Sequence, residues 1–548
     1  MEGVELENTE RPRASVARNA GIISLAVMAS RVLGLVRDQV FAAFFGAGLQ
    51  FDAFITGFRI PNLLRDLFAE GALSSAFVTT FTQTLQSKGK EAAIQLSNHV
   101  ATLIILFVSA ISIIAWIYTP AIVQLLAPGF FAVPGKAELT VQLTRIMIPF
   151  LLMIALAAQA MGILNSVGVF AMPALASAFF NIGSILGGLF LGFLIGPAIG
   201  LSPIAGMAYG TLLGGFLQFA VQWPSLSRAG FKYQPMLRIS DPGVRQIFRL
   251  MGPAIIGTAA VQINVFVNTN FASAIIDAAT GEIANGPVSW LNYAFRFMQF
   301  PIGVFGVAIA TATLPPLSRS TSNPDYAEFR RTLTHSLTLV FLLCIPSAVG
   351  LAVLGRPIVA MVFEHGKFTS FDTVQTANAL AAYSLGLAGY AAVKVLSPAF
   401  YALNDARTPM LISLGSIAVN YVMNSLLVGP FGHVGLAFST SAVALVNFAL
   451  LALFMRRRLG GMEGRRLGLN ILRICAAALP MAAAAWIASE LASALPMHDL
   501  ALRLVQVIAS ITTATIVFYW GCRLLRIEEL TEAVNAIAGR FFRARRSQ

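Results

Sequence analysis

Long apolar stretches, each bounded by a few polar residues, recur from one end of the chain to the other. A helix needs about 20 apolar residues to cross a hydrocarbon core, and on that criterion the sequence predicts about 14 membrane spans. We therefore expect an all-α polytopic membrane protein. The predicted spans are roughly 21–46, 51–86, 95–118, 139–164, 172–196, 203–224, 247–277, 286–316, 332–354, 372–403, 409–429, 433–456, 469–492 and 500–522.

Several of these spans are longer than a bilayer requires and contain proline. Pro61, Pro253, Pro301 and Pro398 each remove a backbone donor from a predicted helix. Such positions are tolerated in membrane helices, where neighbouring groups satisfy the freed carbonyl. We expect a kink at each of them.

Composition supports the membrane assignment. The 548 residues are 57% hydrophobic and only 11% charged, with a mean hydropathy of +0.76, whereas soluble domains carry about 25% charged residues. An ordinary soluble enzyme and a disordered chain are excluded. The net charge of +13 would suggest a nucleic-acid partner in a soluble protein, but here we expect no nucleic acid and interpret the excess as cytoplasmic loops that follow the positive-inside rule.

The basic residues lie mainly on one side of the predicted spans. With the N-terminus inside, the cytoplasmic loops include the run Arg456–Arg458 and a basic tail, whereas the opposite loops hold little more than Lys136, Arg356 and Lys367. The first 20 residues lack a signal-peptide cleavage site. We expect a multi-pass protein of the bacterial inner membrane, with both termini cytoplasmic.

An internal repeat relates the two halves. GMAYGTLLGGFLQFA from Gly206 aligns with GLAFSTSAVALVNFA from Gly435, although chance similarity between two apolar helices is the alternative. A true repeat gives two parallel six-helix lobes around a central cavity. The predicted organisation is an N-terminal tail (1–20), an N-lobe (21–228), a C-lobe (229–458), a C-terminal helix pair (459–525) and a basic tail (526–548).

Ionisable groups inside the predicted spans are the candidate functional residues. One arginine at a helix centre costs about 2.5–3.5 kcal/mol on insertion scales, so such groups must line a hydrated cavity or pair with acids. Adjacent charges on a helix diverge by about 100°, and we expect Arg37–Asp38 and Arg65–Asp66 to need partners on other helices. The candidates in spans one, two and eight are Arg31, Arg37, Asp38, Asp52, Arg59, Arg65, Glu70, Arg296 and Gln299.

Cations outnumber acids among these groups, which favours an anion site over purely structural ion pairs. A guanidinium fork binds two oxygens of a phosphate or carboxylate at once. The three cysteines and five histidines are scattered, without the spacing of a disulfide framework or a metal site. The sequence therefore predicts no catalytic residue, no metal and no cofactor.

Several motifs resemble a known family. SRVLGLVRD (30–38), DAFITGFRIPNLLRDLFAEGALSSAFV (52–78), FPIGVFGVAIAT (300–311), GKFTSFD (366–372) and KVLSPAFYALNDARTP (394–409) are similar to the MurJ (MviN) family of lipid II flippases, within the multidrug/oligosaccharidyl-lipid/polysaccharide exporter superfamily. The resemblance extends from about residue 18 to the last spans. It implies 14 helices in two six-helix lobes, with a final helix pair that forms a groove for the polyprenyl tail.

The resemblance also implies site residues and a function. Arg31, Arg37, Arg65 and Arg296 match the positions of a cationic cavity, and Asp52 matches an acid that matters in relatives. The resemblance also implies a lateral gate between spans one and eight. Phe295 and Gln299 stand where some relatives carry acids, so the resemblance implies no ion pair of those acids here, although Gln299 could hydrogen-bond across the gate. The implied function is movement of lipid II, the undecaprenyl-pyrophosphate-linked peptidoglycan precursor, from the cytoplasmic to the periplasmic leaflet by alternating access, in cell-wall synthesis.

Further expectations concern energy, partners and rivals. Membrane potential or a coupled cation would drive release of the anion, and the partners are lipid II and membrane lipids, with the protein a monomer. The alternative functions are flipping of another polyprenyl-linked glycan and cation-coupled export by a member of the same superfamily. An enzyme acting on polyprenyl phosphates would need a metal-binding acid cluster that the sequence lacks, and a scaffold would not need buried arginines.

Overall fold

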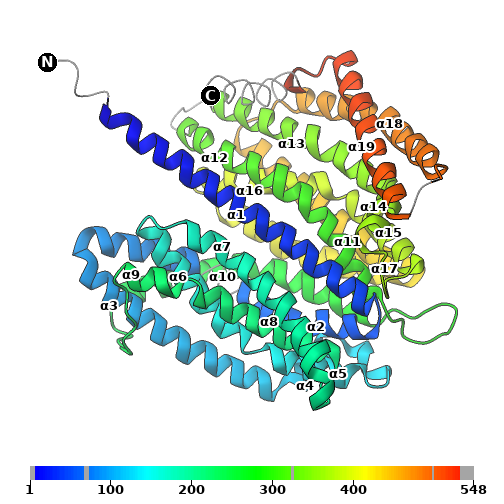
Figure 1. Cartoon of the computed structure of the whole chain (residues 1–548). Coiled ribbons are helices and arrows are strands. Elements are labelled where there is room, and N and C mark those ends of the chain that lie inside the picture. The colour runs from blue at the N-terminus through cyan, green and yellow to red at the C-terminus, as the bar shows by residue number, and fades with distance from the viewer. Residues whose placement is uncertain (1–6, 67–72, 322–325, 497–498, 531–548) are drawn as a thin grey trace. The chain divides into compact units, whose positions relative to one another are not determined.

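The computed structural model describes residues 7–66, 73–321, 326–496 and 499–530 of the chain (Figure 1). It divides into two compact units, residues 1–274 and 275–548. Helices account for nearly all of the described residues, where the one β-bridge is the isolated pair Ile276 and Ile283. The prediction of an all-α membrane protein is confirmed.

Within the described residues of the first unit there are ten α-helices and four short 3₁₀ or π segments that carry a label. Their bounds are α1 Glu7–Phe45, α2 Leu49–Leu64, α3 Ser74–Ile117, α4 Thr119–Leu126, η2 Pro128–Ala132, α5 Lys136–Met147, α6 Phe150–Ser166, α7 Ala171–Ile182, η3 Gly183–Gly187, η4 Phe190–Ile195, η5 Gly196–Ile199, α8 Pro203–Ala220, α9 Trp223–Arg228 and α10 Pro242–Ser273.

The part of the second unit that the structure describes has nine α-helices and one π segment. Their bounds are α11 Pro287–Pro301, η6 Ile302–Gly306, α12 Val307–Ser320, α13 Ala327–Val353, α14 Gly355–Phe363, α15 Ser370–Ser384, α16 Leu387–Ala402, α17 Arg407–Arg458, α18 Gly464–Ser493 and α19 Asp499–Leu524.

Nine helical stretches among the described residues are long and apolar enough to cross a membrane, and the pair α15–α16, bent by 44°, makes ten if it is one span. One of the nine, α17, breaks at Gly432, where φ is 55°. The sequence places the boundary between the predicted spans 409–429 and 433–456 at this point. The number 14 stays a prediction, because α1, α2 and α10 fall outside this set.

Some of the prolines that are expected to kink helices lie inside a helix or next to an irregular turn. Pro61 and Pro398 lie inside α2 and α16, and Pro301 ends α11, directly before the π turn of η6. A π turn widens the helix by one residue and is frequent where a helix must bend. The side chain of Pro253 is not among those that the structure describes, so the kink expected there stays a prediction.

Glycines bring α8 against the helical stretch α7–η4 in the first unit. A Cβ added to Gly206 or Gly210 would overlap the backbone of Gly192 or Gly188, and a Cβ on Gly183 would lie 2.8 Å from the Cα of Gly214. Small residues at intervals of four let two helix backbones touch, as is common inside membranes. This contact explains the glycines of the first repeat copy, while the repeat and the lobe boundaries at 228 and 458 stay predictions.

Candidate functional site

The charged residues of α1 lie on a helix that packs against α7. Asn181 of α7 donates a 3.1 Å hydrogen bond to the backbone carbonyl of Ser30, which fixes α1 beside Arg31. Arg31 is exposed, whereas Arg37 is half-buried and Asp38 is 6% exposed. The Arg37 Nη2 atom lies 3.3 Å from Asp38 Oδ1, and its guanidinium carbon lies 5.5 Å from the centre of the Phe180 ring.

Asp52 forms a buried ion pair that the sequence does not predict. Its Oδ2 atom lies 2.8 Å from Lys136 Nζ, and both side chains have zero exposure. Lys136 also lies over the ring of Phe130, 4.2 Å from its centre. The sequence pattern places Lys136 on a loop outside the spans, which is wrong: Lys136 is the first residue of α5 and is buried, and its ammonium lies over the Phe130 ring and reaches Asp52.

The other charged residues of span two are joined to α10 through Arg59 and Asp66. Arg59 donates a hydrogen bond to Thr269. Arg65 donates to Asp66 Oδ1 from Nε at 3.1 Å and from Nη2 at 2.9 Å. The other oxygen of Asp66 accepts a 3.1 Å hydrogen bond from Gln262.

These contacts correct one expectation. Arg37 with Asp38 and Arg65 with Asp66 pair directly along one helix, although we expect such neighbours to need partners elsewhere. The arginine side chain is long enough to fold back across the angle between adjacent positions, and its planar fork can meet the short aspartate. Asp66 does use a second helix as well, through Gln262.

The sequence reasoning misses the polar residues of α10. Gln262 and Thr269 are seven residues apart, two turns of a helix, and therefore lie on one face of it. Each contacts a charged residue of span two, as given above. Two polar residues at this spacing inside a predicted span could have indicated that this face of the helix contacts polar groups of another span.

The candidates of span eight lie on α11 of the second unit. Arg296 and Gln299 are both exposed and are three residues apart, so their side chains lie on the same side of the helix. Phe295 points elsewhere and packs edge to face on Tyr383, with ring centres 5.4 Å apart. Glu70, proposed from the sequence as a supporting residue, lies outside the described residues.

A second polar network joins α19 to the loop between α14 and α15. Arg503 Nη2 donates to Glu364 Oε1 at 2.8 Å and its Nη1 atom donates to the carbonyl of Ala360 at 3.0 Å. Burial would raise the pKa of the Glu364 carboxyl, but hydrogen bonds from Thr373 and Ser370, with the arginine, outweigh it and lower the pKa below its ordinary value of 4.5. The network ties the C-terminal helix pair to the rest of the second unit.

These residues are suited to binding a ligand rather than to catalysing a reaction. Within the described residues, no group of three or more histidine, cysteine or acidic side chains could hold a metal ion. What the helices α1, α2 and α11 offer is guanidinium groups, some paired with a neighbouring aspartate and some exposed. Such groups suit oxyanions.

Comparison with known proteins identifies relatives along most of the chain. The family model "Lipid II flippase MurJ" matches residues 41–506. The chain is 35% identical over 440 residues to the "Lipid II flippase MurJ" of Burkholderia cenocepacia, covering 80% of this chain and 83% of the relative. It is 37% identical over 437 residues to the probable lipid II flippase MurJ of Vibrio cholerae, covering 78% and 81%.

Solved structures agree with these relatives. The structure titled "Lipid II flippase MurJ, inward closed conformation" superposes with a TM-score of 0.74 at 27% identity and covers 92% of this chain and 99% of its own. An inward-facing multidrug transporter of the MATE family shares the fold, with a TM-score of 0.65 at 16% identity over 80% of this chain and 98% of its own. On the family model, the relatives and the fold together, the chain belongs to the lipid II flippase MurJ family.

Proposed function

We propose that this protein flips lipid II, the undecaprenyl-pyrophosphate-linked precursor of peptidoglycan, from the cytoplasmic to the periplasmic leaflet of the bacterial inner membrane. Family membership supports the assignment. The observation that carries the substrate chemistry is the set of arginines on α1, α2 and α11, helices that coincide with predicted spans. A transporter of apolar or cationic cargo would have no use for them.

Arg31, Arg37, Arg65 and Arg296 are the proposed contacts for the pyrophosphate and peptide carboxylates. Oxyanions are rejected by hydrocarbon unless polar groups replace their water, and charge-assisted bonds to guanidinium groups do so. The polyprenyl tail stays in the lipid, and alternating access of the two lobes exposes the headgroup to each side in turn. Gln299, next to Arg296 on α11, is a proposed gate residue.

Asp38 and Asp66 give the site a means of release. Each lies within ion-pair distance of a proposed ligand arginine, at 3.3 Å and 2.9 Å. When the anion leaves, the aspartate can take its place, so the arginine is not left unpaired at membrane depth. The Arg65–Asp66 pair is partly exposed, and exposed pairs contribute about 0.2–1 kcal/mol, which is small enough for a pyrophosphate to displace the aspartate.

Asp52 and Arg59 have positioning roles in this proposal. The pairs Asp52–Lys136 and Arg59–Thr269 join α2 to α5 and α10, and hold the helix that bears Arg65. Membrane potential or a coupled cation supplies the energy, since moving one charge across 100 mV is worth about 2.3 kcal/mol. The protein acts as a monomer, with both termini cytoplasmic.

Depletion in cells tests the function. Lipid II should continue to be made but become inaccessible to a periplasmic probe when the protein is depleted. A copy with Arg65→Ala should be inserted at normal abundance without restoring access, and Arg65→Lys should restore it only in part, because a point charge does not replace bidentate contacts. Normal access after depletion would contradict the flippase assignment, and loss of a different polyprenyl-linked glycan instead would favour the glycan rival.

A further inference from the structure

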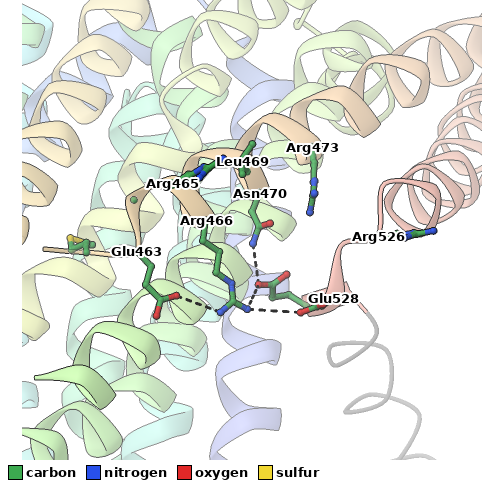
Figure 2. A pocket seen from close by; sticks show the side chains of 11 residues that line it. Glu463, Arg465, Arg466, Leu469, Asn470, Arg473, Arg526 and Glu528 are labelled. Atoms are coloured by element: carbon green, nitrogen blue, oxygen red, sulfur yellow. Dashed lines mark hydrogen bonds and ion pairs between the residues drawn. The ribbon is translucent and has the colours of Figure 1, made fainter.

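A cavity of about 710 Å³ lies where α18 begins and α19 ends (Figure 2). Both helices are long and apolar enough to cross a membrane, and they pack side by side. Their shared end is therefore where two spans leave the hydrocarbon, at the level of the lipid headgroups. The cavity walls are the first turns of α18 and the segment that follows α19.

The charges around this cavity divide into two groups. Arg466 lies among all three of its acids, at 3.4 Å from Glu463, 3.7 Å from Glu529 and 4.0 Å from Glu528. Figure 2 shows this arrangement, with Asn470 donating to the carboxylate of Glu529, at 3.1 Å. All three glutamates of the cavity therefore lie within ion-pair distance of the same arginine, Arg466.

Three further arginines, Arg465, Arg473 and Arg526, line the cavity. All three are exposed, and none has an ion pair with another described residue. Arg473 lies seven residues after Arg466, two turns along the same face of α18, and points to the same side in Figure 2. The surplus of guanidinium groups favours an anion, and phosphate oxygens suit their geometry.

Arg526 stands at a backbone position that favours glycine. Its φ is 52°, and the hydrogen bonds Arg526 N–H to Arg523 and Ile527 N–H to Cys522 close the end of α19 in the pattern of a left-handed cap. Such positions usually hold glycine, because a side chain is strained there. A need for positive charge at the cavity would explain why an arginine, and not glycine, stands at this position.

The surface next to the cavity is apolar. Leu472 on α18 and Leu524 on α19 are 67% and 83% exposed, and Leu469 lines the cavity itself. Guanidinium groups beside exposed leucines suit a molecule with an anionic head and a hydrocarbon tail. A soluble anion would gain nothing from the leucines, and an acidic peptide would not need a site at the headgroup level.

We propose that this cavity binds the headgroup of an anionic phospholipid, with its phosphate on Arg473 and Arg526 and its acyl chains on the exposed leucines of α18 and α19. Arg465 adds a third positive charge at the rim. Because the phosphate joins the start of one span to the end of the other, the bound lipid should stabilise the helix pair. The arginines involved are not among those proposed to bind the lipid II headgroup, and the experiment below measures phospholipid binding alone, so the two proposals are tested separately.

Binding to the purified full-length chain in neutral detergent tests the proposal. The probes are phosphatidylglycerol, phosphatidylcholine with the same acyl chains, and inorganic phosphate, with bound lipid counted by native mass spectrometry and stability followed by thermal unfolding. The variants are Arg526→Gly and the double change Arg473→Gln/Arg526→Gly. The matched control is Arg238→Gln/Arg245→Gln, which removes two exposed charges from the other unit.

We expect phosphatidylglycerol to bind and to raise the unfolding temperature, and phosphatidylcholine and phosphate to do neither. Affinity for phosphatidylglycerol should fall about tenfold in Arg526→Gly and about a hundredfold in the double variant, at the strength of charge-assisted bonds, and stay unchanged in the control. Arg526→Gly should unfold no earlier than the parent without lipid, because glycine suits the left-handed φ, so its loss of lipid is not misfolding.

Two results would overturn the proposal. The double variant could bind phosphatidylglycerol as tightly as the parent, which would place the lipid elsewhere. Alternatively, inorganic phosphate could stabilise the parent as much as the lipid does and fail to stabilise the double variant. The site would then be one for a soluble anion.

Discussion

At the scale of single residues, each of two proposed ligand arginines has an aspartate as its next neighbour in sequence and its partner in space. Arg37 pairs with Asp38 and Arg65 with Asp66. The aspartate competes with any bound anion for the same guanidinium, so it lowers affinity and aids release. An anion site built for transport needs that balance, whereas a site built only to hold its ligand does not.

Asp66→Asn should therefore tighten binding and slow transport. Removing the competing charge should raise the affinity for lipid II about 1.4- to 5-fold, from a pair worth about 0.2–1 kcal/mol, while turnover falls because release is harder. Binding to the purified protein and accessibility of lipid II in cells are the two measurements. Asp277→Asn, on an exposed loop, is the matched control, and weaker binding by Asp66→Asn would contradict the proposed role.

The buried pair Asp52–Lys136 should behave as a structural unit. Lys136→Met leaves the Asp52 carboxylate buried without its partner, which should cost about 3–5 kcal/mol of unfolding free energy. The double variant Asp52→Leu/Lys136→Met removes both charges and should recover most of that loss. Thermal unfolding in detergent measures both, and equal instability of the single and double variants would show that the two groups do not act as a pair.

At the scale of helices, apolar length and polar interruption predict several of the helix boundaries. The break of α17 at Gly432 falls at a predicted boundary, and the helices of the C-terminal pair match their predicted spans closely. The partners of the charged residues could not be predicted in this way. Lys136 looks like a loop lysine because it follows Pro134 and Gly135, and only the folded chain brings it to Asp52. Likewise, Gln262 is 196 residues from Asp66, a distance at which no sequence period applies.

The contact between α8 and the stretch α7–η4 depends on its glycines. Gly210→Leu should force the two backbones apart, because overpacking of a close contact costs about 1–3 kcal/mol or more, and the amount of folded protein in the membrane should fall. Gly415→Leu is the control, since Gly415 is exposed and an added Cβ there meets nothing within 4 Å. Equal abundance of the two variants would mean that the close contact adds little to stability.

The tie between α19 and the α14–α15 loop should respond to pH. The pKa of Glu364 is lower in the folded protein than its ordinary value of 4.5, so its contribution to stability is complete above 4.5 and is lost as the pH falls through the lower folded value. Between pH 6 and pH 3.5, the unfolding temperature should fall less in Glu364→Gln than in the parent. Parallel curves for the two proteins would contradict this assignment.

At the scale of the whole molecule, the charge of +13 separates into parts with different proposed roles. Most of the basic residues lie on predicted cytoplasmic loops and tails, where they set orientation. A few arginines on α1, α2 and α11 are the proposed contacts for lipid II, and those where α18 begins and α19 ends are the proposed contacts for an anionic phospholipid. Family membership supports lipid II as the substrate in the first proposal, and the cavity of Figure 2 supports the second proposal at the headgroup level.

The most direct test of the central claim is transport by the purified protein. Vesicles containing the full-length chain and labelled lipid II are given a membrane potential, and the fraction of lipid II that reacts with an impermeant external reagent is followed over time. We predict that the wild-type protein makes lipid II of the inner leaflet reactive, and that Arg65→Ala leaves it protected in vesicles with the same amount of folded protein. Equal protection with and without the wild-type protein, or full transport by Arg65→Ala, would contradict a flippase that works through these arginines.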